Sequence, residues 1–142
     1  MKTVWCDAQV FNNGQPGQDA WCCVVLDDST ESGKLLLDEH LGDKPINASE
    51  YMGVIRSLEW GLASKERLTV ITDSEIVYQQ VYEMKSCGEF LTPFKQQVRE
   101  LLRETQSRLQ WEPRRFNKAG WYYENKNKKK KSKAEFSVVH IS

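Results

Sequence analysis

The sequence predicts an α/β domain in which an antiparallel meander of three strands is followed by strands of a partly parallel sheet. Three strand-like segments in the first 42 residues are separated only by turns, which favours antiparallel pairing. Further along, a continuous apolar segment at residues 67–74 is typical of a buried strand with a parallel neighbour. The apolar residues on either side of it follow a helical spacing. A chain of 142 residues fits one such domain.

The three N-terminal strands are expected at residues 3–10, 20–28 and 33–42. The first two are rich in Val, Trp and Cys, and the turn-rich sequence FNNGQPGQD separates them. The polar turn DSTESG leads into the third strand.

A helix is expected over residues 47–65, because apolar side chains recur there at i, i+3, i+4, i+7 and i+11. Asn47 or Ser49 is its expected N-cap. The residues of this apolar face are Tyr51, Val54, Ile55, Leu58 and Leu62.

The remaining elements follow the buried strand. Helices are expected at residues 75–84 and 94–107, then a short strand at residues 108–113, and a last helix from about residue 117.

Charge is distributed unevenly along the chain, although the net charge is zero. Residues 1–100 contain 9 Lys/Arg and 16 Asp/Glu, whereas residues 101–142 contain 11 and 4. Acidic groups concentrated away from a basic end suit a site that gathers cations beside a surface that attracts phosphate. Solubility alone would also explain the asymmetry.

The cysteines and the hydropathy favour a cytoplasmic protein. The four cysteines show no CxxC spacing and lie mostly in apolar runs, so reduced thiols are expected rather than disulfides. No apolar run approaches the roughly 20 residues of a membrane span. The N-terminus has no secretory signal pattern, and no membrane association is expected.

Three acidic residues lie where a carboxylate needs a partner or a ligand. Asp7 lies inside an apolar strand between Cys6 and Ala8, and no local role explains it. Asp73 follows the apolar run LTVIT, where it would either cap the next helix or face a site. Glu50 lies early in a helix, where it would either interact with the helix dipole or reach the same site.

The expected sheet brings these acids together. Ligands of open α/β sheets bind near the carboxyl ends of strands, where the connection order reverses. If residues 3–10 and 67–74 form neighbouring strands, Asp7 and Asp73 share one crevice, and Glu50 reaches it from the helix. Oxygen ligands without His or Cys suit Mg²⁺ or Mn²⁺. Two such ions would activate water for phosphodiester hydrolysis.

Four segments, in order and at the right spacing, resemble the type 1 ribonuclease H family over roughly residues 3–123. WCDAQVFNNGQPGQDAWCCVV is similar to its first hairpin and NASEYMGVIRSLEWGL to its Asn-x-x-Glu helix. VITDSEIVYQQV resembles its Thr-Asp-Ser strand end, and WEPRRFNKAG its Val-Pro-Arg-x-x-Asn-Lys segment of the bacterial short-loop type. The resemblance implies a ribonuclease H-like fold at residues 1–125, followed by a Lys-rich C-terminal extension at residues 126–142.

The implied fold has a five-stranded mixed sheet flanked by helices, in which strands 1–3 are an antiparallel meander and strands 4 and 5 are parallel. Carried over by position, the resemblance makes Asp7, Glu50 and Asp73 catalytic and metal-binding. The residues expected to contact the substrate are Gln15, Asn47, Ser74, Arg114 and Lys118.

The family's fourth carboxylate falls on Trp121, with Gly120 before it, so neither register supplies an acid. Glu124, one helical turn further on, either reaches back toward a metal or is a surface residue. The missing acid is expected to weaken the second metal site or to slow product release. His40 and His140 do not match the family's loop histidine and are expected to be ordinary surface or strand residues.

The last helix combines aromatic and basic residues. Trp121, Tyr122 and Tyr123 would either stack on a base or sugar or pack on the sheet, and packing is expected for at least two of them. Lys128–Lys131 would either neutralise phosphates in a salt-sensitive manner or form a solvated tail.

The sequence therefore predicts a cytoplasmic endonuclease that hydrolyses the RNA strand of RNA–DNA hybrids by a two-metal-ion mechanism with Mg²⁺ or Mn²⁺. No obligate protein partner is expected. One alternative is a catalytically impaired nucleic-acid-binding module of the same fold, in which Trp121 fills the space of the lost ligand. Another is a DNA-directed nuclease of this fold.

Overall fold

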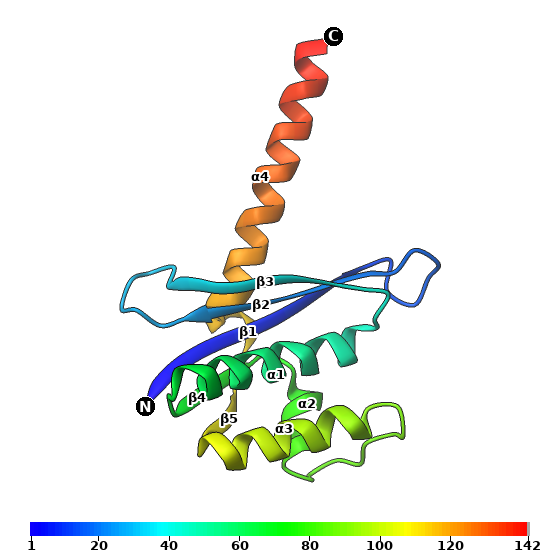
Figure 1. Cartoon of the computed structure of the whole chain (residues 1–142). Helices are drawn as coiled ribbons and strands as arrows, with labels where there is room; N and C mark the ends of the chain where they lie inside the picture. The colour runs from blue at the N-terminus through cyan, green and yellow to red at the C-terminus, as the bar shows by residue number, and fades with distance from the viewer. Residues whose placement is uncertain (142) are drawn as a thin grey trace.

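A computed structural model describes the backbone of residues 1–141 and the side chains of residues 1–130. The order of elements confirms the predicted order, with one added 3-10 turn (Figure 1). The elements are β1 Lys2–Phe11, β2 Asp19–Leu26, β3 Lys34–Gly42, α1 Ile46–Ser64, β4 Leu68–Thr72, α2 Glu75–Val81, α3 Thr92–Thr105, β5 Arg108–Trp111, the 3-10 helix η1 Arg114–Phe116 and α4 Lys118–Ile141.

The five strands form one mixed sheet in the order β3-β2-β1-β4-β5. β1 and β3 each pair antiparallel with β2, whereas β4 pairs parallel with both β1 and β5. The predicted meander and the predicted parallel strands are therefore confirmed. Because β1 and β4 are parallel neighbours, residues near the carboxyl ends of their paired segments meet at one place.

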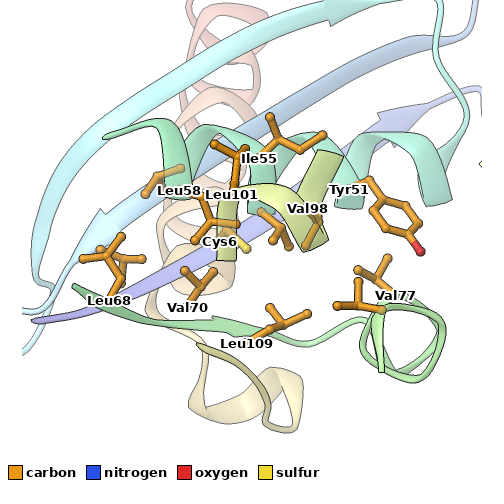
Figure 2. Packing of buried hydrophobic residues seen from close by; sticks show 14 residues of the cluster. Cys6, Tyr51, Ile55, Leu58, Leu68, Val70, Val77, Val98, Leu101 and Leu109 are labelled. Carbon is orange, nitrogen blue, oxygen red and sulfur yellow. The ribbon is translucent and has the colours of Figure 1, made fainter. Parts of the chain in front are cut away.

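Helices cover the two faces of the sheet unequally. α1, α2 and α3 lie on one face, and α4 rises from the other (Figure 1). The larger core fills the space between the sheet and α1 and α3, where Val4 and Cys6 of β1 pack among residues such as Ile55 and Val98 (Figure 2). A smaller core, which includes Trp5 of β1, lies under the start of α4.

The start of α1 differs from the prediction. The helix begins at Ile46 and its N-cap is Pro45, whose φ of −71° and ψ of 163° give it an extended backbone, so neither Asn47 nor Ser49 caps it. Ser49 instead donates its hydroxyl to the carbonyl oxygen of Pro45 at 2.9 Å. The ring of Pro45 fixes its φ at a value that is compatible with the start of a helix. The helix therefore begins one residue before Asn47, and neither polar side chain caps it.

The predicted apolar face of α1 is buried except at its C-terminal end. Tyr51, Val54, Ile55 and Leu58 are fully buried, whereas Leu62 is 48% exposed. The last turn meets β4 through Gly61, where an added Cβ would lie 2.8 Å from the side chain of Leu68. Leu62 is the next residue after Gly61, and its exposed side chain is directed away from the sheet.

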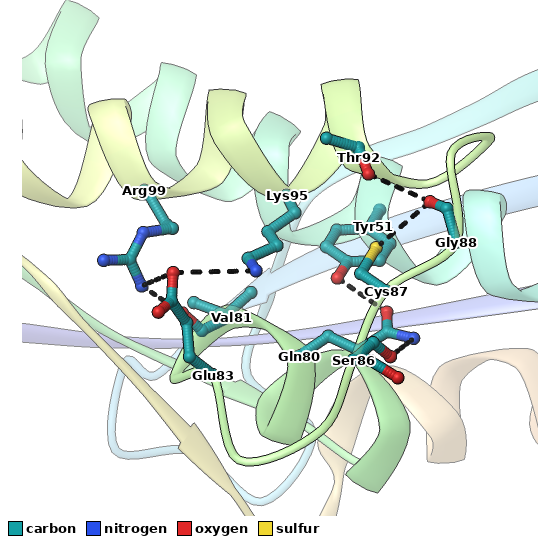
Figure 3. A network of polar contacts seen from close by, with 10 residues as sticks. All are labelled: Tyr51, Gln80, Val81, Glu83, Ser86, Cys87, Gly88, Thr92, Lys95 and Arg99. Carbon is teal, nitrogen blue, oxygen red and sulfur yellow. Dashed lines mark hydrogen bonds and ion pairs between the residues drawn. The ribbon is translucent and has the colours of Figure 1, made fainter.

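A polar network ties α2 and the connection that follows it to α1 and α3 (Figure 3). The hydroxyl of Tyr51 donates to Gln80 at 2.8 Å, and Glu83 lies 3.6 Å from Lys95 and 3.7 Å from Arg99. These contacts fix the helix that begins just after β4.

α4 is anchored to the sheet by one acidic residue of β3. The carboxylate of Asp38 accepts hydrogen bonds from the hydroxyls of Tyr122 at 2.6 Å and Tyr123 at 3.2 Å, and from the ammonium of Lys126 at 2.6 Å. Tyr123 is buried and Tyr122 is half-buried in the smaller core, so the predicted packing of at least two aromatics is confirmed. The expected boundary between residues 125 and 126 lies within this one continuous helix.

The remaining expectations concern cysteine, histidine and membranes. All four cysteines are free, as expected, and three of them are buried. His40 is an exposed residue of β3 that pairs with Asp19, and His140 lies outside the residues whose side chains are described. Within the described part of the chain, no helix has the length and apolarity needed to cross a membrane.

Candidate metal centre

Asp7, Glu50 and Asp73 come together from three elements. Asp7 lies in β1, Asp73 directly follows β4, and Glu50 lies in α1. One carboxylate oxygen from each can be chosen so that all three lie within 4.8 Å of one another. The predicted convergence of these acids at the β1–β4 junction is therefore what the structure shows.

Asp73 is not a helix cap, and Glu50 is not a first-turn residue that interacts with the helix dipole. α2 is capped by Ser74, whose hydroxyl accepts a hydrogen bond from the backbone N–H of Val77 at 3.2 Å, so Asp73 is not the cap. The first turn of α1 contains no acidic residue, and Glu50 is buried rather than placed at the helix end. Both side chains are directed toward the shared site instead.

A glycine brings α1 close enough for Glu50 to reach β1. A Cβ added at Gly53 would lie 3.3 Å from the Cβ of Cys6 and 3.6 Å from the carbonyl oxygen of Asp7. Such a contact is tighter than most side chains tolerate, so a larger residue would push the helix away from the strand. The close approach of helix and strand therefore depends on this position.

Most of the carboxylate oxygens are buried without a hydrogen-bond partner in the protein. Both oxygens of Asp7, one of Glu50 and one of Asp73 are buried and unpaired. Unpaired buried carboxylates are costly unless a cation neutralises them. An all-oxygen set of this kind fits a hard divalent cation such as Mg²⁺ or Mn²⁺.

Burial, together with repulsion by neighbouring acids at Asp7 and Glu50, raises the pKa of these three carboxyls. Burial first, and the charge of Asp73 second, raise the pKa of Asp7 to about 7. Burial, Asp7 and Asp73 raise the pKa of Glu50 well above its usual value, and burial raises that of Asp73. The positive charge of Arg114 acts in the opposite direction and lowers the pKa of all three.

The fold has structural relatives among solved proteins. The sequence matches no protein-family model and no curated protein. RNase H1 of the halophilic archaeon Halobacterium salinarum NRC-1 is 20% identical and superposes with a TM-score of 0.70, covering 83% of this chain and 89% of that one. LC11-RNase H1 in complex with an RNA/DNA hybrid is 21% identical, with a TM-score of 0.67 and coverage of 82% and 88%.

A third structure agrees with these two. The N-terminal RNase H domain of Rv2228c from Mycobacterium tuberculosis is 22% identical, with a TM-score of 0.65 and coverage of 82% of this chain and 86% of the other. The chain has the ribonuclease H fold. The fold expected from the four sequence segments is confirmed over most of the chain.

Within this ribonuclease H fold, three of the expected substrate contacts lie near the acids or near the start of α1. Ser74 follows Asp73 directly, and Asn47 lies in the first turn of α1. Gln15 lies on the exposed turn between β1 and β2. That turn is tied to α1, because the side-chain oxygen of Asn13 accepts a hydrogen bond from the backbone N–H of Ile46 at 3.2 Å.

Lys118 is engaged in contacts inside the protein. Its ammonium donates to the carbonyl oxygen of Thr30 at 2.7 Å, lies 3.8 Å from Asp27 and stacks over the ring of Trp5 at 4.8 Å from the centroid. None of these contacts joins it to the three acids, so its assignment to substrate remains a prediction.

Trp121 does not fill the space beside the acids. Its indole N–H donates to the carbonyl oxygen of Arg115 at 3.0 Å, and its ring lines a cavity of about 500 Å³ with Val25 and Tyr122. Gly120 faces the site instead, since a Cβ added there would lie 3.5 Å from an oxygen of Asp7. The rotation of α4 therefore assigns the position beside Asp7 to Gly120.

Asn117 is a positioning residue that the sequence reasoning missed. It is fully buried, donates its amide to the carbonyl oxygen of Cys6 at 3.0 Å, and accepts from the backbone N–H groups of Ala119 at 2.9 Å and Gly120 at 3.3 Å. It therefore caps α4 and fastens it to β1 next to Asp7. The signal was present, because Asn immediately before a helix is a common N-cap.

Proposed function

We propose that this chain is a metal-dependent endonuclease of the type 1 ribonuclease H family that hydrolyses the RNA strand of RNA–DNA hybrids. The convergence of buried, unpaired oxygens of Asp7, Glu50 and Asp73 carries this proposal. The ribonuclease H fold supports it, as does the RNA/DNA hybrid bound in the LC11-RNase H1 structure.

The three carboxylates would hold Mg²⁺ or Mn²⁺, as in the two-metal-ion mechanism that the resemblance implies. Such ions activate a water for attack on phosphorus and stabilise the leaving oxygen. The chain itself supplies a dry, preorganised set of ligands, because Glu50 and Asp7 are almost fully buried and β1, α1 and β4 fix their positions.

The substrate would be bound by residues on either side of these acids. Gln15, Asn47 and Ser74 would contact the hybrid near the acids, and the exposed guanidinium of Arg114 would contact phosphate. The exposed lysines 128–130 of α4 would add sequence-independent affinity that falls with rising salt. Three buried, free cysteines support a reducing, cytoplasmic location for this activity.

A cleavage assay with labelled RNA–DNA hybrid tests this function. The wild type is expected to cut the RNA strand only with Mg²⁺ or Mn²⁺, and Asp73→Asn to lower the rate by at least about 100-fold, because disturbing a ligand's supporting contacts alone costs 10–100-fold. Glu104→Gln, an acid-to-amide change at an exposed residue of α3, is the matched control and should retain the wild-type rate.

The substrate panel also separates the alternatives. Duplex RNA and duplex DNA are assayed beside the hybrid. Binding of the hybrid without cleavage in either metal would contradict the enzyme and favour a binding module. Preferential cleavage of duplex DNA would favour a DNA-directed nuclease.

A further inference from the structure

A groove lies between α4 and the turn that joins β2 to β3, and it contains a cavity of about 500 Å³. Cavities of this size are typical of sites for small ligands. One wall is a single face of α4, because its lining residues recur at helical spacing. They are Lys118, Trp121, Tyr122, Asn125 and Lys129. The opposite wall comes from β2, β3 and the turn, and we call the space between the two walls the α4 groove.

The groove is open because α4 covers only part of its face of the sheet and then continues beyond the sheet (Figure 1). Val25 of β2 and Leu35 of β3 are paired neighbours, so their side chains lie on the same face. Both residues line the groove. Val25 is buried, whereas Leu35 is 43% exposed. The groove therefore offers apolar surface that the described part of the chain leaves uncovered.

Two aromatic side chains of the groove are held in place by hydrogen bonds. The indole N–H of Trp121 donates to the carbonyl oxygen of Arg115 at 3.0 Å, and the hydroxyl of Tyr122 donates to Asp38 at 2.6 Å. Both aromatic residues are half-buried, so part of each remains accessible. A fixed, partly accessible ring is a platform on which a nucleic-acid base can stack, and every base has a face that suits it.

Lys118 fixes the turn at one end of the groove. Its ammonium donates to the carbonyl oxygen of Thr30 at 2.7 Å and lies 3.8 Å from Asp27, so it ties α4 to the turn. The chain at Gly33 then runs so close to β2 that an added Cβ would lie 2.7 Å from the side chain of Val25. The groove is therefore a preformed feature of the fold, and a ligand would not have to order it.

The two walls of the groove differ in charge. The α4 wall ends at Lys129, which is exposed and has Lys128 and Lys130 on either side. The turn carries Asp28 and Glu31, both exposed, and Glu31 lines the groove. A phosphate of a ligand is therefore favoured on the α4 side of the groove and disfavoured at the turn.

Glu124 does not alter this difference between the walls. It is the only acid among residues 118–130 of α4, and its carboxylate lies 3.8 Å from the guanidinium of Arg114. It is not among the residues that line the groove, and among the described side chains it does not join the three acids of the candidate metal centre. The candidate from the sequence for a fourth ligand is therefore a surface residue that pairs with an arginine.

We propose that the α4 groove binds an unpaired nucleotide of single-stranded nucleic acid, with the base stacked on Trp121 and the phosphate beside Lys129. Aromatic platforms next to a basic wall are the means by which proteins bind single strands. The groove begins beside the proposed metal centre, because Gly120 precedes Trp121 and faces Asp7. The inference goes beyond the proposed function, since it requires neither a metal ion nor cleavage.

Fluorescence anisotropy of labelled single strands of about 12 nucleotides, titrated with the full chain in a chelator, tests the proposal. The wild type is expected to bind DNA and RNA strands of the same sequence. Trp121→Ala removes the platform and should weaken binding at least about tenfold, whereas Trp121→Phe keeps a ring and should stay within about threefold of the wild type.

A second variant changes the opposite wall of the groove. Leu35→Glu places a negative charge there and should also weaken binding at least about tenfold. Leu62→Glu is the matched control, because it makes the same change at an exposed leucine of α1 outside the groove, and it should bind within about twofold of the wild type. Circular dichroism checks that each variant is folded.

Three results would overturn the inference. The first is a wild type that binds no single strand. The second is unchanged binding in both Trp121→Ala and Leu35→Glu, which would show that the lysines alone attract the strand. The third is tighter binding of a glutamate-rich peptide that the same two variants weaken, which would favour a protein ligand.

The proposed function is tested separately from this groove. Asp73→Asn should bind the single strand as the wild type does, because Asp73 belongs to the metal centre and does not line the groove. Loss of hybrid cleavage with intact single-strand binding would contradict the proposed function alone. Intact cleavage of a blunt hybrid without single-strand binding would contradict the inference alone.

Discussion

Asp7→Asn is expected to abolish hydrolysis and, in the same protein, to stabilise the metal-free fold by about 2–3 kcal/mol at pH 8. Both Asp7 oxygens are buried, unpaired and close to two other acids. The isosteric amide removes one charge from this cluster, and its N–H groups can donate to the unpaired oxygens of Glu50 and Asp73. Urea unfolding in the presence of a chelator measures the gain.

The matched control is Glu104→Gln, at an exposed position of α3, which should change the free energy of unfolding by less than about 0.5 kcal/mol. Addition of Mg²⁺ should stabilise the wild type but not Asp7→Asn, because only the wild type retains the complete ligand set. A metal-free Asp7→Asn protein less stable than the wild type by more than about 1 kcal/mol would show that the acids do not repel one another in the fold.

The stability of the metal-free wild type is expected to fall as the pH rises from about 5 to 8. The pKa of Asp7 is raised from 3.8 to about 7 by burial and by Asp73. Between these values the folded state keeps a proton that the unfolded state has lost, so stability is full below the unfolded pKa and is lost as the pH passes the folded pKa. The loss from this group between pH 5 and 8 is on the order of 2–3 kcal/mol.

Two comparisons make this pH profile specific to the centre. Asp7→Asn should make it shallower, leaving the part that comes from the raised pKa of Glu50 and Asp73, and saturating Mg²⁺ should remove most of the loss at pH 8, because the cation replaces the proton on the same oxygens. The pKa values of Asp19 and Asp28 are lowered, so these two groups change the stability only below about pH 4, which lies outside the measured range. A metal-free stability that rises or stays constant between pH 5 and 8 would contradict the raised pKa of Asp7.

Much of the fold could be predicted because the spacing of apolar residues along the chain reflects which side chains are buried. The short turns between the first three strands predicted the β1–β2–β3 meander, the continuous apolar run predicted the fully buried β4, and the spacing from Tyr51 to Leu58 identified α1. The three acids could be predicted because each stands at a position where an unpaired carboxylate is costly. The assignment of Asp7 depended least on resemblance, since a strand-interior acid has no local partner.

The rest of the site depends on rotations and contacts that spacing does not determine. Counting from Asn117 assigns the fourth position to Trp121, but the hydrogen bonds of Asn117 to Cys6 and to the start of α4 turn Gly120 toward Asp7. Lys118 was expected at the substrate, yet its partners come from the distant β2–β3 turn. Such long-range partners leave no local pattern in the sequence.

The central claim is that Asp7, Glu50 and Asp73 are the ligands of a divalent cation, and anomalous X-ray diffraction from crystals soaked in Mn²⁺ tests it most directly. The account predicts a strong anomalous peak within coordination distance, about 2.0–2.3 Å, of oxygens from all three carboxylates. That peak should disappear in Asp73→Asn crystals grown and soaked in the same way. A wild-type crystal with no peak at these carboxylates, or with manganese bound only elsewhere, would contradict the account.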